Sequence, residues 1–204
     1  MYTNTFIKIL IGGACWALVA TAQAAGNPEN GKLKFATCTG CHSIPGYTSA
    51  YPNYHVPRLG GQNADYIVAA LNGYKAGDRK HPTMHANAFS LSDQDMADIA
   101  AYVASIKPNE ESHPIKGDVA AGQQKAEACA ACHGKEGNAP TTSAFPKLAG
   151  QHEDYLSKSL HDYKTGARKN VIMSGMATPL SDKDIAALAA YFASQPNGVY
   201  VVKD

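Results

Sequence analysis

The chain has 204 residues, which is enough for one domain of ordinary size or for two small ones. Its 18 Lys and Arg residues balance 17 Asp and Glu residues, so the formal net charge is +1. Because neither a basic stripe nor an acidic block stands out along the sequence, we do not expect nucleic acid as a partner.

Residues 1–24 have the composition of an export signal. Lys8 is the only charge, an apolar run extends from Ile9 to Ala20, and Ala22-Gln23-Ala24 has the small-x-small pattern of a cleavage site. An uncleaved membrane anchor is the alternative, although the run is short for a transmembrane helix. We therefore expect a cleaved signal peptide and a mature protein in the periplasm, where cysteines meet an oxidising environment.

Three helices are predicted in each half of the remaining chain, and no alternating strand pattern accompanies them. Gly77 is placed to end the second helix, and Ser92 with Asp95 resembles a capping box at the start of the third. The sequence therefore predicts an all-α fold. The predicted helices cover residues 28–38, 64–75 and from 92 onward in the first half, and residues 119–129, 153–164 and 181–194 in the second.

Four of the five cysteines form two short motifs, Cys38-Thr39-Gly40-Cys41-His42 and Cys129-Ala130-Ala131-Cys132-His133. A redox dithiol and a zinc site also use paired cysteines, but neither needs the histidine that follows directly in both copies. In haem c attachment the two thiols add to the porphyrin vinyl groups and the imidazole faces the iron. A zinc site would have to join pairs that lie 91 residues apart, whereas haem c explains each copy locally. We predict two covalently attached haem c groups, held by Cys38, Cys41, Cys129 and Cys132, with His42 and His133 as iron ligands.

An internal repeat relates the two halves. Residues 57–107 align with residues 146–196 at an offset of 89, and 24 of the 51 positions are identical. A polar stretch with two prolines lies between the halves. We therefore predict a signal peptide over residues 1–24, one domain over 25–107, a linker over 108–114 and a second domain over 115–204.

The repeat also suggests the sixth iron ligands. Met84 and Met173 align, and each lies seven residues before a Leu-Ser-Asp sequence. His/Met ligation in both halves raises the reduction potential relative to ligation by two histidines. Met176 is an alternative in the second half, where the first half has Asn87. Met96 is expected in the core of a helix. The remaining histidines have no repeated partner and are expected on the surface or in loops: His55, His81, His85, His113, His152 and His161.

Together with the two Cys-x-x-Cys-His motifs, the Pro-x-Leu-x-Gly-Gln block at 57–62 and 146–151 and the Met-x6-Leu-Ser-Asp block at 84–93 and 173–182 resemble the di-haem cytochrome c4 family. The resemblance covers residues 26–195. It implies two tandem class I cytochrome c domains related by a pseudo-twofold axis, with His42 and Met84 on one iron and His133 and Met173 on the other.

The resemblance also implies roles for residues near the haem groups. The carbonyls of Pro57 and Pro146 would accept the Nδ1 protons of the two ligand histidines and orient their rings. Arg79 and Arg168 are candidates to neutralise haem propionates, with a solvated loop arginine as the alternative in each case.

Two iron ions with six ligands each leave no position for a substrate, so we expect an electron carrier and not an enzyme. The resemblance implies redox protein partners, namely a respiratory electron donor and a terminal oxidase. Peripheral association with the membrane is the alternative to a freely diffusing carrier. A di-haem electron-transfer subunit of a periplasmic dehydrogenase or flavocytochrome is the second hypothesis, and a haem enzyme such as a peroxidase is the third.

Overall fold

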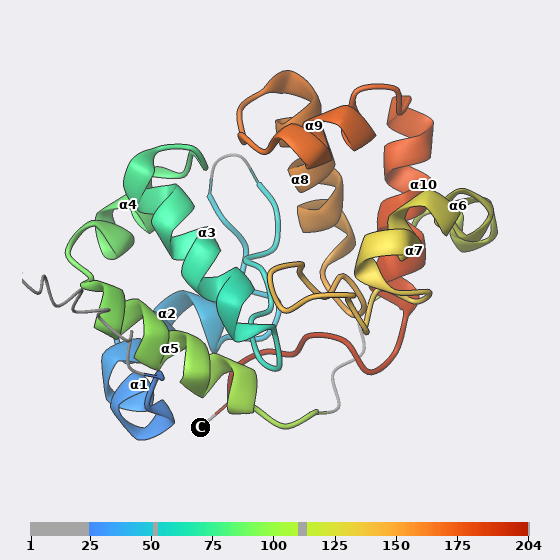
Figure 1. Cartoon of the computed structure of the whole chain (residues 1–204). Coiled ribbons are helices and arrows are strands. Elements are labelled where there is room, and N and C mark those ends of the chain that lie inside the picture. Colours follow the sequence, from blue (N-terminus) through green and yellow to red (C-terminus); the bar gives the residue numbers. More distant parts are fainter. Residues whose placement is uncertain (1–24, 51–52, 110–113, 204) are drawn as a thin grey trace, which may run out of the picture.

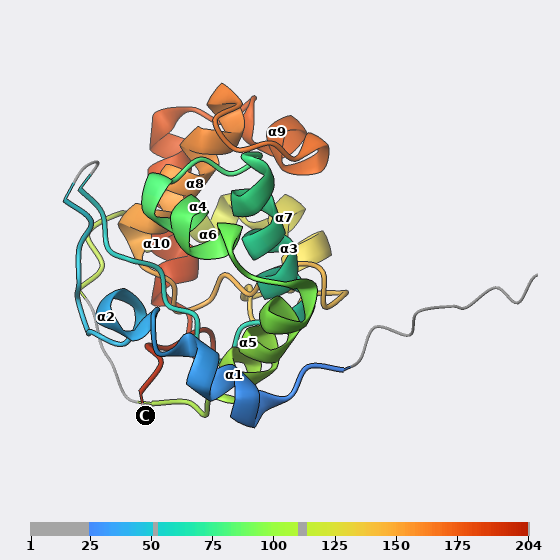
Figure 2. The same ribbon diagram turned by 90° about the vertical axis from the view of Figure 1, so that its left-hand side faces the viewer.

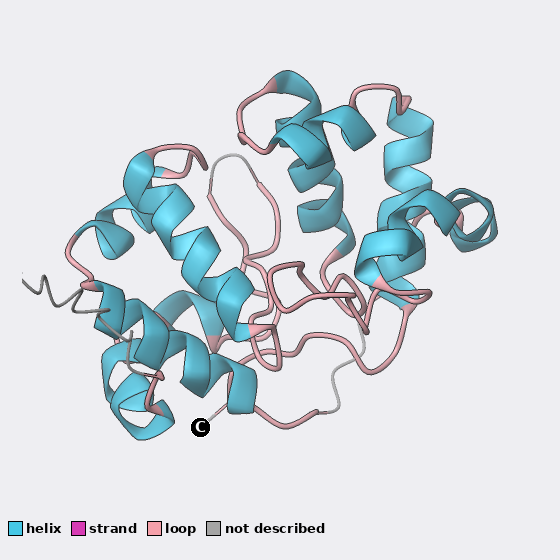
Figure 3. Ribbon diagram, viewed as in Figure 1, coloured by secondary structure: helices cyan, strands magenta, loops and turns pink. Residues whose placement is uncertain are grey.

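The computed structural model describes residues 25–50, 53–109 and 114–203, so the predicted signal peptide lies outside the described residues. Within these ranges the chain forms helices joined by loops and a few isolated bridges, without a strand (Figure 3). This confirms the predicted all-α class. The helices are α1 (Pro28–Phe35), α2 (Thr39–His42), α3 (Ala64–Ala76), α4 (Pro82–Phe89), α5 (Asp93–Ser105), α6 (Val119–Lys125), α7 (Glu127–His133), α8 (Glu153–Thr165), α9 (Val171–Ala177) and α10 (Asp182–Ser194).

The helices form two halves of the same design, α1–α5 and α6–α10, which lie side by side in Figure 1. In the first half α5 packs against α1 and α3, and in the second half α10 packs against α6 and α8. Each half has its own apolar core, built around Phe35 and Val103 in the first and around Leu188 and Phe192 in the second. The buried apolar side chains of the long helices thus hold each half together separately.

The longest predicted helices agree with the structure to within one or two residues. Gly77 ends α3 with a left-handed φ of 78°, a conformation that glycine adopts without strain. Ser92 and Asp95 form the predicted capping box at the start of α5, and Ser181 and Asp184 form its counterpart at α10. Local caps and apolar periodicity were sufficient to locate these helices.

The structure differs from the prediction around the cysteine motifs and the methionines. The first helix of each half ends before the motif, and the motif forms a short helix of its own, α2 or α7. The helices α4 and α9, which carry Met84 and Met173, were not predicted. Both helices are short, and each is capped at its start by a side chain that accepts a hydrogen bond from a backbone N–H. The capping side chain is that of His81 in α4 and that of Asn170 in α9. Asn170 is an ordinary N-cap residue and was a usable signal, whereas His81 is an unusual one.

The C-terminal tail crosses from the second half to the first, and in Figure 1 the chain ends beside α5. Tyr200 exchanges two backbone hydrogen bonds with Gly60, with N–O distances of 2.8 and 2.9 Å. Val202 is buried in the core of the first half, and Val199 donates its N–H to Ala149 in the second. The tail therefore ties the two halves together.

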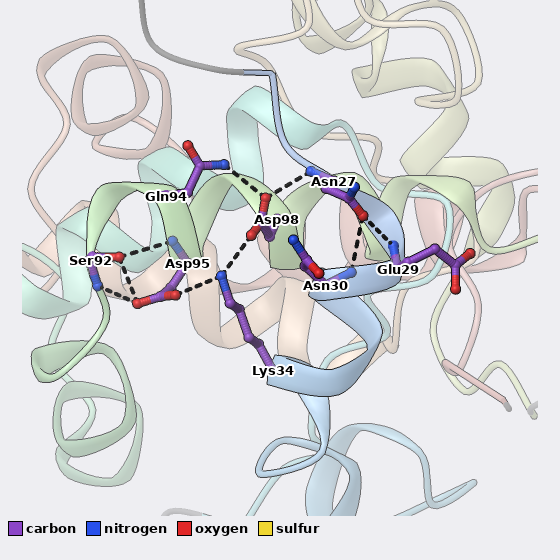
Figure 4. A network of polar contacts seen from close by, with 8 residues as sticks. All are labelled: Asn27, Glu29, Asn30, Lys34, Ser92, Gln94, Asp95 and Asp98. Carbon is purple, nitrogen blue, oxygen red and sulfur yellow. Dashed lines mark hydrogen bonds and ion pairs between the residues drawn. The ribbon is translucent and has the colours of Figure 1, made fainter.

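Helix α1 is fastened to α5 by a buried carboxylate (Figure 4). Asp98 is 1% exposed and accepts hydrogen bonds from the backbone N–H of Asn27 at 2.7 Å, from Lys34 Nζ at 2.6 Å and from Gln94 Nε2 at 2.8 Å. These three hydrogen bonds lower the pKa of Asp98 to about 2, and the bond from the Asn27 N–H has the largest effect. The second half has Ala187 at the equivalent position, so only the first half depends on this charge.

We expect Asp98→Asn to destabilise the first half at neutral pH and to make its stability depend less on pH in the acid range. Because the pKa of Asp98 is lower in the folded state, the carboxylate stabilises the fold above its unfolded pKa of about 4. This contribution is lost as the pH falls toward about 2. Urea unfolding followed by circular dichroism should show a steeper loss of stability between these two pH values in the wild type than in the variant. Equal pH slopes would contradict this account.

Candidate functional site

The first cysteine motif places a buried histidine against a backbone carbonyl. Cys38 is the N-cap of α2, and His42 ends the helix. The Nδ1 atom of His42 lies 2.9 Å from the carbonyl oxygen of Pro57, and the side chain is 7% exposed. Burial, as the main cause, lowers the pKa of His42 to about 4. The ring is therefore neutral at neutral pH, donates through Nδ1 and leaves Nε2 available to a metal.

The second motif repeats this geometry on α7. The Nδ1 atom of His133 lies 2.8 Å from the carbonyl oxygen of Pro146, and the side chain is 5% exposed. Burial also lowers the pKa of His133, against the effect of the Pro146 hydrogen bond. The expected contacts between the two histidines and the two proline carbonyls are thus present in both halves.

The cysteines fit covalent haem attachment better than the other two chemistries. Burial raises the pKa values of Cys38 and Cys129, whereas a reactive dithiol requires a lowered pKa. No group of three or more His, Cys, Asp or Glu side chains in the described part of the chain is arranged to hold a metal ion, so the two motifs do not share a zinc site. In each half, two thiols and a neutral imidazole oriented by a carbonyl lie in one short helical motif, and this arrangement fits a haem c group.

The aligned methionines occupy equivalent places in the two halves. Met84 lies on α4, which packs against α3, and Met173 lies on α9, which packs against α8. In Figures 1 and 2 both short helices lie on the side of the molecule opposite the C-terminus. Met84 and Met173 are half-buried, whereas Met176 is 38% exposed. Met96 is fully buried, which confirms its expected place in the core.

Arg79 and Arg168, which occupy equivalent positions in the repeat, meet at the boundary between the halves in an antiparallel bridge. Each guanidinium carbon lies 4.5 Å from the ring centre of a tyrosine in its own half, and each guanidinium donates to a tyrosine hydroxyl of the other half. The solvated-loop alternative for these arginines is therefore wrong. Arg79 lies over the ring of Tyr74 and donates to Tyr155. Arg168 lies over the ring of Tyr163 and donates to Tyr66.

Two buried glutamines join the halves, and the sequence had not identified them as functional residues. The side chain of Gln62 bonds the backbone of Lys147, and that of Gln151 bonds the backbone of Arg58. These contacts, like those of the arginines, are reciprocal, as a pseudo-twofold axis requires. Their place in the repeated Pro-x-Leu-x-Gly-Gln block was the available signal.

One of the histidines without a repeated partner, His152, is buried although it lies in a loop. His152 is 5% exposed, and its ring stacks on that of His55 at a centroid distance of 4.8 Å. His152 lies in the loop before α8, as its N-cap, so the expected surface or loop position holds through the loop and not through exposure. His55 in turn bonds the carboxylate of Asp154 at 2.7 Å, across the boundary between the halves. Asp154 aligns with Asp65, but Asp65 bonds Ser143. Neither His55 nor His152 is repeated in the other half, so an alignment of the halves does not suggest these contacts.

Comparison with known proteins places both halves in one family. The family model for cytochrome c matches twice, over residues 28–107 and 119–196. A cytochrome c4 of Pseudomonas aeruginosa is 58% identical over 189 residues, which cover 85% of this chain and 91% of the relative.

Two further relatives extend this comparison. The crystal structure of reduced recombinant cytochrome c4 from Pseudomonas stutzeri superposes with a TM-score of 0.70 at 34% identity, and the match covers 84% of this chain and all of that one. The thiosulfate dehydrogenase electron acceptor of Stutzerimonas stutzeri is 31% identical over 91% of this chain and 93% of its own length. The two matches of the family model include both cysteine motifs.

Proposed function

The chain belongs to the cytochrome c4 family of di-haem electron-transfer proteins, and we propose that it carries single electrons between a respiratory donor and a terminal oxidase in the periplasm. The observation that supports this role most strongly is the repeated site. Each half has two thiols in one short helical motif and a neutral, buried histidine whose ring is oriented by a carbonyl. Two such sites in one chain suit a relay between two redox partners.

Each haem c, when bound, supplies one-electron chemistry at its iron. The proposed attachment residues are Cys38 and Cys41 in the first half and Cys129 and Cys132 in the second. The residues that would bind the iron are His42 and Met84 in the first half and His133 and Met173 in the second.

The residues around each site would orient and complete the ligands of the iron. The carbonyls of Pro57 and Pro146 fix the tautomers of the two histidines, so that Nε2 would be free to bind the iron. With Met84 and Met173 as the remaining ligands, each iron would have no free position for a substrate, which favours a carrier over an enzyme.

We further propose that the mature protein begins after residue 24 and contains domains over 25–107 and 115–204, joined by a linker over 108–114. Within the described residues no helix is both long and apolar enough to cross a membrane. The composition of residues 1–24 supports export to the periplasm.

A second candidate function is that of an electron acceptor for a periplasmic dehydrogenase. The relative named thiosulfate dehydrogenase electron acceptor matches nearly the whole chain and supports this alternative. A stable, stoichiometric dehydrogenase partner on purification would favour it over a freely diffusing carrier.

Mixing experiments with the haem-loaded protein test the two candidates. The carrier role predicts that membranes containing a terminal oxidase reoxidise the reduced protein rapidly, and that the purified protein alone does not turn over hydrogen peroxide. Reduction by a dehydrogenase and its substrate, without reoxidation by such membranes, would favour the second candidate. Rapid peroxide turnover would contradict both.

A further inference from the structure

One peptide group of the first half lies between its buried histidine and a glutamine of the second half. The carbonyl of Pro57 accepts the hydrogen bond from His42 Nδ1 at 2.9 Å. The N–H on the other side of the same peptide bond belongs to Arg58, and it donates to Gln151 Oε1 at 2.9 Å. A short chain of hydrogen bonds therefore leads from the second half to the proposed iron ligand of the first.

The opposite chain of hydrogen bonds leads from the first half to the second. The carbonyl of Pro146 accepts the hydrogen bond from His133 Nδ1 at 2.8 Å. The N–H of the same peptide bond belongs to Lys147 and donates to Gln62 Oε1 at 2.8 Å. Each half thus supplies the glutamine behind the histidine of the other half.

The glutamine side chains are held in one orientation. Gln62 is 3% exposed and Gln151 is 5% exposed. Each Oε1 atom also accepts the N–H of the residue that follows its own glutamine, at 2.9 Å for Gln62 and 3.0 Å for Gln151. Each Nε2 atom donates to the carbonyl of Lys147 or Arg58 across the boundary, at 3.0 and 2.9 Å respectively. A flipped amide would place donors against donors, so the acceptor oxygen is fixed on the peptide N–H.

Hydrogen bonds on the two ends of a peptide group strengthen one another. Donation from the N–H increases the negative charge on the carbonyl oxygen, and linked bonds gain about 10–30% each in condensed-phase estimates. A stronger bond from Nδ1–H to that oxygen makes the imidazole a more basic ligand. A more basic ligand stabilises the ferric state and lowers the reduction potential of the iron that it binds.

We propose that Gln151 and Gln62 are positioning residues that tune the axial histidine of the opposite half. Gln151 acts on His42 through the Pro57–Arg58 peptide, and Gln62 acts on His133 in the same way. The inference rests on the proposed ligand role of the two histidines. It adds that each potential is partly set by the other half, so docking of the halves is linked to electron transfer between them.

The test uses the haem-loaded protein and the variants Gln151→Leu and Gln62→Leu. The matched control is Asn63→Ala, because Asn63 also bonds across the boundary but to the carbonyl of Phe145, at 2.7 Å, and not to a peptide N–H behind a histidine. Spectroelectrochemical titration gives the two midpoint potentials. Proton NMR of the reduced protein gives the Nδ1 proton shift of each ligand histidine, which reports the strength of its hydrogen bond and assigns the affected half.

We expect a crossed result. Gln151→Leu should raise the midpoint potential of the first half and move the Nδ1 proton of His42 upfield, while the second half stays unchanged. Gln62→Leu should do the reverse, and Asn63→Ala should change neither potential. If Gln151→Leu does not load two haem groups, Gln151→Asn withdraws the acceptor oxygen by one methylene length while keeping a polar side chain.

Three outcomes would overturn the inference: a shift confined to the half that carries the substitution, equal shifts in both halves, or no shift in a correctly loaded variant. These are distinguishable from failure of the proposed function. If the wild-type protein lacked two low-spin haem groups, the ligand roles themselves would be wrong, whatever the variants did.

Discussion

Replacement of Met173 by alanine is expected to remove about half of the weak long-wavelength ferric band that methionine–iron ligation produces, because one of the two proposed methionine ligands is lost. The potential of the second half should fall at the same time. Met173 is the proposed ligand because it aligns with Met84, is half-buried on α9 and has its backbone N–H fixed by Asn170 at 2.9 Å. The ferric optical spectrum of the purified variant provides the measurement.

Met176→Ala is the matched control, since the two methionines lie on the same short helix. Met176 is 38% exposed, and the first half has Asn87 at its position. We expect this variant to keep the full band and both potentials. Loss of the band in Met176→Ala with retention in Met173→Ala would assign the iron ligand to Met176 and overturn the argument from the repeat.

Substitution of Gly122 by alanine is expected to destabilise the second half by about 3 kcal/mol, because overpacking at a close helix crossing forces the backbones apart. A Cβ atom at Gly122 would lie 2.0 Å from the carbonyl oxygen of Ala187 and 2.6 Å from Cβ of Tyr191. The neighbours are backbone and the base of a side chain, so neither can rotate away. Urea unfolding of the haem-loaded protein, followed by circular dichroism, measures the loss.

Gly175→Ala serves as the control for the change from glycine to alanine within a helix. Gly175 lies in α9, and a Cβ atom there would meet no atom within 4 Å. We expect this variant to be unchanged or more stable by about 0.5–1 kcal/mol, because alanine loses less backbone entropy on folding. Equal stability of the two variants would show that α6 and α10 do not cross as closely as described.

The elements that the sequence predicts well depend on local signals. The capping box of Ser92 and Asp95 and the glycine at position 77 mark the ends of long amphipathic helices, and the structure has both. The short helices α4 and α9 are held by caps and by packing on α3 and α8, and apolar periodicity did not predict them. Asn170 offered a local signal for α9, but the packing of both helices on α3 and α8 is not contained in a linear pattern.

The candidate sites show the same division between local and long-range information. The two Cys-x-x-Cys-His motifs and the aligned methionines follow from spacing and from the repeat. The repeat also marks Gln62 and Gln151 as equivalent, but it cannot show that each one reaches the peptide behind the histidine of the other half. That contact depends on how the halves dock, which is set by packing between residues about 90 positions apart.

An optical redox titration of the purified mature protein, with haem content determined on the same sample, tests the central claim most directly. The account predicts two haem groups per chain, both low-spin and both with methionine–iron ligation, which titrate as two one-electron steps. One high-spin haem, or the absence of the methionine band from either half, would contradict the ligand assignment and favour a haem enzyme over an electron carrier.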